Sequence, residues 1–350
     1  MKYLKYTLSF TGPFAIFLSL YFNGLGSYIA LIYLFGLIPL LELVMKPDSR
    51  NMSKAEEELA KEDKVYDFLI YANLPIHYGL LFYYLHIIQS HDLEWFSIIG
   101  KTLSIGISCG ALGINVAHEL GHRNTWYEQL MSKALLLSTH YMHFFIEHNR
   151  GHHKNVSTDE DPASAKKGES IYLFWPRTII FSYLSAWKLE NSRIRKQGKQ
   201  VISLHNEMVQ FTIIQLTFML LIFLVFGWKG LLAHGFASLI GILLLETVNY
   251  VEHYGLRRKL IKGEYYEKVL PHHSWNSDHV IGRMMLFELS RHSDHHYIAN
   301  RKYQVLRHFD DSPQMPTGYP GMMLLSLIPP AWFWIMDKKV SEVENNFQNN

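Results

Sequence analysis

Four short segments of the sequence are rich in histidine, whose ring nitrogens are the commonest nitrogen ligands for transition metals. Nine of the 20 histidines lie in these segments. In three of them the histidines are three or four positions apart, which brings their rings to one face of a helix. We therefore expect one metal site built from HELGH, EHNRGHH, NYVEH and RHSDHH, through His118, His122, His148, His152, His153, His253, His292, His295 and His296.

The number of these histidines indicates the kind of site. HELGH resembles the zinc-protease motif HExxH, but that motif needs only one further ligand to complete its zinc site. Nine neutral nitrogens exceed what one zinc ion binds, and they suit two ions of borderline softness with four or five nitrogens each. We favour two non-haem irons, because iron can activate dioxygen and zinc cannot.

Further polar residues accompany the clusters. A carboxylate that accepts the second ring N–H of a ligand fixes the orientation of that ring. We expect this supporting role for at least two of the four neighbouring acidic residues; direct ligation by one of them and simple helix-surface charge are the alternatives. Two histidines in PHHSWNSDH are candidates for a tenth ligand or a redox-docking contact. These supporting residues are Glu119, Glu147, Glu252, Asp294, His272 and His273.

The composition favours a membrane protein and limits its cofactors. Charged residues make up 18% of the chain and the net charge is +2 with histidine neutral, which gives no sign of a nucleic-acid-binding surface. The single cysteine, Cys109, cannot form an intramolecular disulfide or hold an iron–sulfur cluster. We expect no haem and no flavin in this chain, and any redox cofactor that needs thiolate ligands must arrive on a partner protein.

Six apolar segments predict membrane-spanning helices. Lys and Arg concentrate in the links after the second and fourth segments, so the positive-inside rule places both termini and both long polar regions in the cytoplasm. The predicted fold is an all-α, multi-pass protein of a bacterial inner membrane, a single domain over 1–350. Cytoplasmic regions 118–210 and 249–350 form its helical cap and hold the di-metal site. The predicted spans are Leu8–Phe22, Tyr28–Val44, Phe68–Ile88, Trp95–Ala117, Phe211–Gly227 and Leu231–Val248.

The fourth span carries a row of small residues directly before the first histidine cluster. Gly106, Gly110 and Gly113 share one face of this span, which continues into His118. Close packing of neighbouring helices is the interpretation we favour for this pattern. A groove that admits an alkyl chain to the site is the alternative.

The motifs around the clusters also resemble a known family. The chain is similar to the integral-membrane alkane monooxygenases, which are related to xylene monooxygenase and more distantly to membrane fatty-acid desaturases. The similarity lies in NVAHELGHR, EHNRGHHKNVSTDEDPASAKKGES, NYVEHYGL, PHHSWNSDH and SRHSDHHYIANRKYQVLRHFDDSPQMPTGYPGM. It extends from about Ala117 to the C-terminal end of the sequence, with a compatible pattern of spans before it.

This resemblance implies six membrane helices and a non-haem di-iron centre whose ligands are the nine clustered histidines. It also implies hydroxylation of the terminal methyl group of a medium-chain n-alkane to a primary alcohol. Dioxygen would be the oxidant, and electrons would come from rubredoxin or a ferredoxin with its NAD(P)H-dependent reductase. Rubredoxin iron needs four cysteines, so the carrier would be a separate protein.

Three other functions compete with this interpretation. A desaturase would use a similar site but leave a double bond, and His253 in NYVEHYGL argues against it. A xylene-type monooxygenase differs in the methyl-bearing substrate, which the sequence does not distinguish. A metal transporter would place its ligands near the middle of the bilayer, whereas these clusters follow the predicted cytoplasmic ends of the spans.

Overall fold

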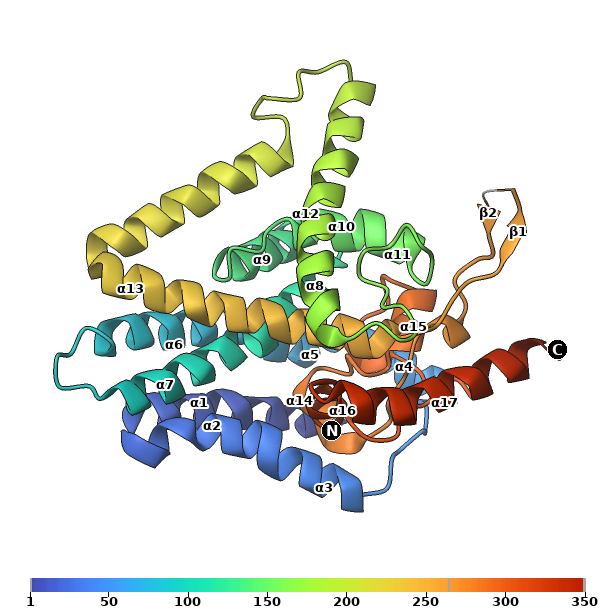
Figure 1. Ribbon diagram of the computed structural model, residues 1–350, viewed down its shortest axis with the longest axis horizontal. Helices are drawn as coiled ribbons and strands as arrows, with labels where there is room; N and C mark the ends of the chain where they lie inside the picture. Colours follow the sequence, from blue (N-terminus) through green and yellow to red (C-terminus); the bar gives the residue numbers. More distant parts are fainter. Residues whose placement is uncertain (1, 264, 349–350) are drawn as a thin grey trace.

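Helices form nearly all of the regular structure in the computed structural model, which describes residues 2–263 and 265–348 (Figure 1). The two strands, β1 (Leu260–Lys262) and β2 (Tyr265–Tyr266), pair antiparallel in a small hairpin that projects from the helices. The helical fold class predicted from the sequence is therefore confirmed.

The predicted spans all lie in helices. Among the described residues, three helices are long and apolar enough to cross a membrane, Gly24–Val44, Trp95–Gly121 and Glu207–His253. The number of spans, six, stays a prediction. The helices concerned are α1 (Thr11–Tyr21), α2 (Ile29–Ile32), α3 (Ile38–Val44), α5 (Lys64–Tyr71), α6 (Asn73–Ile87), α7 (Trp95–Ser108), α8 (Asn115–Gly121) and α13 (Glu207–His253).

The predicted fifth and sixth spans are the two arms of α13. Gly227 separates them with φ 61° and ψ −167°, a backbone conformation that glycine adopts without a steric penalty. The chain bends sharply there, and the two arms diverge in Figure 1. The second arm packs against α7 and ends at His253, so the bend sets where that histidine lies.

Helix α9 (Trp126–Leu137) folds back against α8, and a non-helical turn then leads to α10 (Phe144–Glu147). Histidines of the neighbouring helices bind this turn. His77 contacts the hydroxyls of Ser108 and Ser138 at 2.8 and 2.7 Å, and His234 Nε2 donates to the Ser138 carbonyl at 2.8 Å. The backbone of the turn therefore finds partners among surrounding helices rather than in water.

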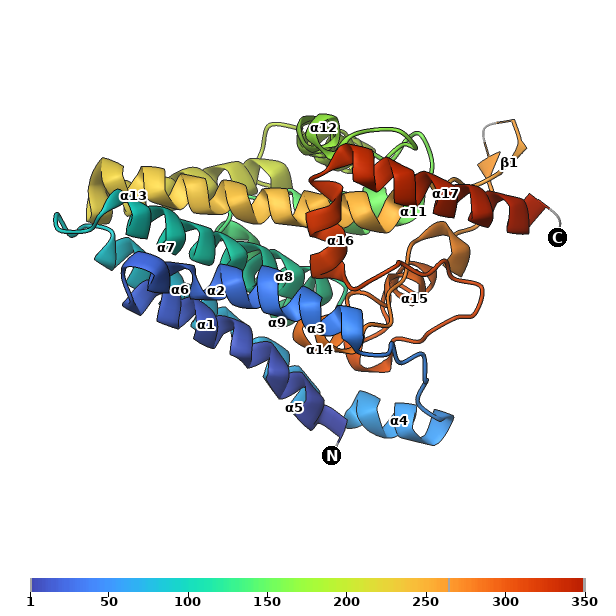
Figure 2. The same ribbon diagram turned by 60° about the horizontal axis from the view of Figure 1, so that its bottom comes forward.

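The remaining helices gather at one end of the bundle. α12 (Ile171–Lys196) and α16 (Tyr319–Ser326) cross α13, and α17 (Pro329–Gln348) packs beside the C-terminal end of α13 (Figure 2). The same end also contains α4 (Lys54–Glu62), α11 (His153–Asn155), α14 (Val280–Met285) and α15 (His292–Tyr297) (Figure 2). The last residues of α8 and α13 meet α11 and α15 there, which brings the four histidine clusters together.

Candidate metal centre

All nine clustered histidines lie at this end of the bundle, in two groups whose ring nitrogens converge. Within each group the candidate ligand atoms all lie within 4.8 Å of one another. The first histidine group consists of His118, His122, His148, His153 and His295; the second histidine group consists of His152, His253, His292 and His296. The structure thus divides the candidate ligands five and four, a division that the sequence did not specify. Their role as ligands stays a prediction.

The spacing of the nitrogens in the first histidine group fits a bound ion. The Nε2 atoms of His118 and His295 are 2.9 Å apart, and His153 Nε2 lies 3.0 Å from that of His148 and 3.1 Å from that of His295. A neutral ring has one N–H, so these nitrogens cannot all hydrogen-bond to one another. An ion roughly 2.1 Å from each nitrogen would place ligands at right angles about 3.0 Å apart.

The second histidine group has the same spacing. His152 and His296 approach through Nε2 at 3.2 Å, and His292 and His253 do so at 3.1 Å. Nitrogen donors of this type suit a transition metal of borderline softness, and iron is one such metal. The residues present therefore fit the two irons that the histidine clusters suggest.

A π-helical turn explains why neighbouring histidines belong to different groups. His148–His152 form such a turn, which takes more than four residues to complete. His153, five positions after His148, therefore comes round to the side of His148, while His152 points to the second histidine group. Because a regular α-helix would pair positions four apart, sequence spacing could not assign these rings.

Burial keeps the candidate ligands in the form that binds metal, except for His152, whose pKa is raised because the charge of Asp161 outweighs burial. Burial lowers the pKa of the His148, His153, His292, His295 and His296 rings well below the usual value, and neighbouring rings lower it further. These rings are therefore neutral near pH 7. A neutral ring keeps the lone pair that a metal requires.

One of the four predicted supporting carboxylates approaches a ring of the site. Glu252 Oε2 lies 3.2 Å from His292 Nε2, and Glu252 Oε1 accepts the Tyr319 hydroxyl at 2.7 Å. The distance to His292 equals that between ring nitrogens of the second histidine group. Glu252 therefore faces the same point as those rings, where it can hold a metal or a group bound to one.

The other three carboxylates bind groups outside the two histidine groups, as far as the described residues show. Glu119 accepts two hydrogen bonds from Arg123, Glu147 accepts one from Ser185, and Asp294 accepts three from Arg307. Each lies next to a histidine in sequence but points to another element. Their contribution is to hold the helices that carry the ligands, and a direct effect on the rings stays a prediction.

Asp161 is a buried carboxylate that sequence spacing missed. His152 Nδ1 donates to its Oδ2 at 2.9 Å, which leaves the His152 Nε2 lone pair for the second histidine group. Ser164 Oγ and the Ala163 N–H also donate to it, at 2.5 and 3.1 Å. Asp161 follows His152 by nine positions across a turn, so helical periodicity does not connect them. The quoted motif EHNRGHHKNVSTDEDPASAKKGES, which contains both residues, was the available signal.

Replacing Asp161 with asparagine is expected to weaken iron binding at the second histidine group by about 10–100-fold, because the His152 ring loses the charged acceptor that orients it. Iron titration of the purified protein should show one site unchanged and one weakened. The exposed Asp159, changed to asparagine, is the matched control. Equal affinity at both sites of the Asp161 variant would contradict this role.

His272 and His273 join neither histidine group. They lie with Glu267 in a separate cluster. The Leu270 N–H donates to His273 Nδ1 at 2.9 Å, so the ring proton is on Nε2, which faces Glu267 Oε1 at 3.1 Å. Both nitrogens of His273 are thus engaged without a metal. A role for this pair in the site or in docking stays a prediction.

An apolar cavity of about 130 Å³ reaches the histidines from among the helices. Its walls include Ile16 of α1, Ile107 of α7, Leu244 of α13 and Met323 of α16. At its other end it is lined by His118, His148, His292 and Glu252. The cavity therefore connects an apolar space inside the bundle with both histidine groups.

The three glycines of the fourth predicted span have different surroundings. Gly110 lines the cavity. A Cβ at Gly106 would lie 2.5 Å from the side chain of Ile240, so that glycine permits close packing of α7 on α13. Gly113 lies beside the ring of His77 instead. The channel interpretation is thus supported at one of the three positions, and the packing interpretation at another.

A buried charge network supports the segment before α15. Glu288 accepts hydrogen bonds from Arg283 Nε at 2.7 Å, the Tyr6 hydroxyl at 2.7 Å and Lys5 Nζ at 3.0 Å. Phe287 and Glu288 have φ of 53° and 58°, which is unusual for residues with a side chain. The network therefore holds a strained turn only a few residues before His292.

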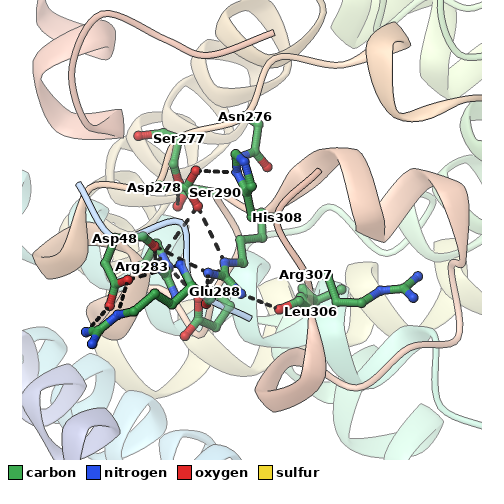
Figure 3. A network of polar contacts seen from close by, with 12 residues as sticks. Asp48, Asn276, Ser277, Asp278, Arg283, Glu288, Ser290, Leu306, Arg307 and His308 are labelled. Atoms are coloured by element: carbon green, nitrogen blue, oxygen red, sulfur yellow. Dashed lines mark hydrogen bonds and ion pairs between the residues drawn. The ribbon is translucent and has the colours of Figure 1, made fainter. Parts of the chain in front are cut away.

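Arg291 connects this network to loops that are distant in sequence. Its guanidinium donates to the Leu306 carbonyl at 2.7 Å and to the Arg50 carbonyl at 2.9 Å. Nearby, His308 Nδ1 lies 2.7 Å from Asp278 Oδ2 (Figure 3). Because Arg291 immediately precedes His292, the start of α15 is fixed to the N-terminal half of the chain.

Replacing Glu288 with glutamine is expected to destabilise the protein in a pH-dependent way. Burial raises the pKa of Glu288, but the charges of Arg283, Lys5 and Arg291 outweigh burial and lower it to about 2. A lowered pKa stabilises the fold by about 3 kcal/mol above pH ~4.5, and this is lost as the pH falls towards 2. Thermal unfolding in detergent should show a difference from wild type that shrinks below pH ~4. The exposed Glu58, changed to glutamine, should show none; a constant difference would contradict the charge mechanism.

The sequence of the chain is similar to those of known proteins. The fatty acid desaturase family model matches residues 93–325. The chain is 42% identical to alkane 1-monooxygenase 2 of Pseudomonas aeruginosa over 309 residues, which cover 87% of this chain and 82% of that protein. It is 40% identical to alkane 1-monooxygenase of Pseudomonas putida, with coverage of 87% and 76%. The xylene/toluene monooxygenase hydroxylase component of Pseudomonas putida is 30% identical, with coverage of 78% and 73%.

Proposed function

The chain belongs to the alkane 1-monooxygenases of the fatty acid desaturase family, and from that membership we propose that it hydroxylates the terminal methyl group of medium-chain n-alkanes. As a member, it is an oxidoreductase of the membrane that hydroxylates alkanes at a di-iron site. The proposal adds the position of attack, the length of the substrate and the source of the electrons.

The cavity is the observation that carries the proposal. It is apolar along its length and has His118, His148 and His292 at one end, so a guest without polar groups can reach the site. An apolar cavity of roughly 150 Å³ stays dry and binds small hydrocarbons in other proteins. The cavity described here, of about 130 Å³, has that size and character.

The length of the cavity supports a medium-chain substrate. Ile107 is the lining residue of α7 farthest along the chain from His118, eleven residues before it. Eleven residues of helix span about 16 Å. An extended chain advances about 1.2 Å per bond, so a chain of at most roughly fourteen carbons fits between Ile107 and the site.

The walls of the cavity would select the position of attack. Terminal C–H bonds are the strongest in a linear alkane, so selectivity must come from placing the chain end at the site. The apolar lining of the cavity disfavours water beside the chain. Bound iron would supply the reduction of dioxygen and the oxidation of the C–H bond.

We propose a separate rubredoxin or ferredoxin, with an NAD(P)H-dependent reductase, as the electron source. Cys109, the single cysteine, is buried in the bundle and cannot form a thiolate-ligated centre by itself. We further propose that both termini and the histidine site face the cytoplasm of an inner membrane. The positive-inside rule places the basic loops of the sequence on that side. Reduced carrier would then reach the site from the cytosol.

A desaturase and a methyl-aromatic hydroxylase are the alternatives. Purified membranes should be supplied with rubredoxin, its reductase, NADH and octane, with m-xylene in a parallel reaction. Two irons per chain and 1-octanol as the product would support the proposal. Zinc in place of iron, an alkene product, or faster turnover of xylene than of octane would each reject it.

A further inference from the structure

A second pocket reaches the histidine site, and its lining is polar. Its volume is about 240 Å³, and it touches His122 of the first histidine group. The lining residues are Lys64, Asp67, His122, Arg123, Asn124, Thr125, Tyr127, Glu128, Asn300 and Lys302. The apolar cavity touches different histidines, His118, His148 and His292, so the site has two separate approaches.

The polar pocket leads from solvent inward. Lys64 has 84% of its side chain exposed and Lys302 has 27%, whereas Asp67 and Arg123 have 8% and 5%. His122 lies beyond them and is itself partly exposed, unlike most rings of the two groups. The side chains that line the pocket therefore become less exposed from the surface towards His122, which is one of the candidate ligands.

Ion pairs fix the charged side chains that line the polar pocket. Lys302 Nζ contacts both oxygens of Asp67 at 3.0 and 3.2 Å, and Arg123 Nη1 contacts Asp67 Oδ1 at 3.2 Å. Arg123 is fixed in turn by Glu119 on α8. These charged groups are already paired, so the pocket offers fixed polar partners to water molecules rather than a free charge for an ion.

We propose that this pocket is the aqueous port of the site, through which protons enter and water leaves. This inference rests on the proposed function. Each hydroxylation combines the alkane, dioxygen, two electrons and two protons into the alcohol and one water, so water and protons must cross the protein. The apolar cavity offers them few hydrogen-bonding partners, and the polar pocket offers many.

The port is tested by narrowing it with tryptophan. Asn124 and Asn300 line it and are exposed, so Asn124→Trp and Asn300→Trp should leave the fold and the iron content unchanged. Gln200→Trp, an exposed position in the loop after α12, is the matched control. Two measurements are needed, the rate at which a sulfonated ferrous chelator removes iron and the kcat for octane.

Each port variant should slow iron removal about tenfold and lower kcat at least fivefold, with the KM for octane unchanged. The Gln200 control should match wild type in all three. Iron removal at the wild-type rate in both port variants would overturn the proposal, and so would slowed removal with unchanged kcat. If wild type hydroxylates no alkane, the proposed function fails, yet the chelator still shows whether the pocket admits solutes from water.

Discussion

Replacing His253 with alanine is expected to remove one of the two irons and to lower octane hydroxylation by at least ~100-fold. The second histidine group has four rings, so this change leaves three. His253 is fully buried and its Nε2 lies 3.1 Å from that of His292, where no water-exposed group can replace it. Metal analysis of the purified variant should give about one iron per chain.

The first histidine group provides the control for this experiment. His122→Ala leaves four rings there, as many as the intact second histidine group has. We therefore expect the His122 variant to retain more iron than the His253 variant. Two irons and full turnover after loss of His253 would remove it from the ligand set. Equal loss of both irons would show that the two groups bind metal as one unit.

The sequence was sufficient to identify the candidate ligands but not to divide them. Histidine spacing identified eight of the nine rings, and His253 was identified by its motif NYVEH. His118 and His122, like His292 and His296, are four positions apart on helical turns, and each pair stays in one group. His148 and His152 are also four apart, yet a π-helical turn sends them to different groups. Such a turn is a local widening of the helix that spacing alone does not reveal.

The segments around the site were likewise predicted only in part from the sequence. Apolar runs predicted that these segments form helices, because a membrane-spanning segment must satisfy its backbone hydrogen bonds within itself. Tertiary partners were harder to predict, since they depend on how loops fold. Asp161 reaches His152 only after a turn, and Glu288 binds Lys5 and Tyr6 from the opposite end of the chain. No periodicity links positions that far apart.

The residues that line the apolar cavity and those that line the polar pocket suit different molecules. An alkane gains about 0.8 kcal/mol for each CH₂ it buries, and it gains this only while the cavity wall leaves room for the chain. Ile107, far along α7 from His118, therefore limits how much of a long chain can be buried. Chain-length preference should accordingly depend on the end of the cavity far from the histidines.

Replacing Ile107 with alanine is expected to shift the preference towards longer alkanes, because the smaller side chain leaves room for further CH₂ groups. Each extra buried CH₂ should raise kcat/KM for the longer alkane about fourfold, from roughly 0.8 kcal/mol. Competition between octane, decane and dodecane, with the alcohols separated by gas chromatography, measures the shift. Ile105→Ala makes the same truncation on α7 at a buried position outside the cavity lining, so it should lose stability without changing the preference. Equal shifts in both variants would mean that looser packing, rather than the cavity end, sets chain length.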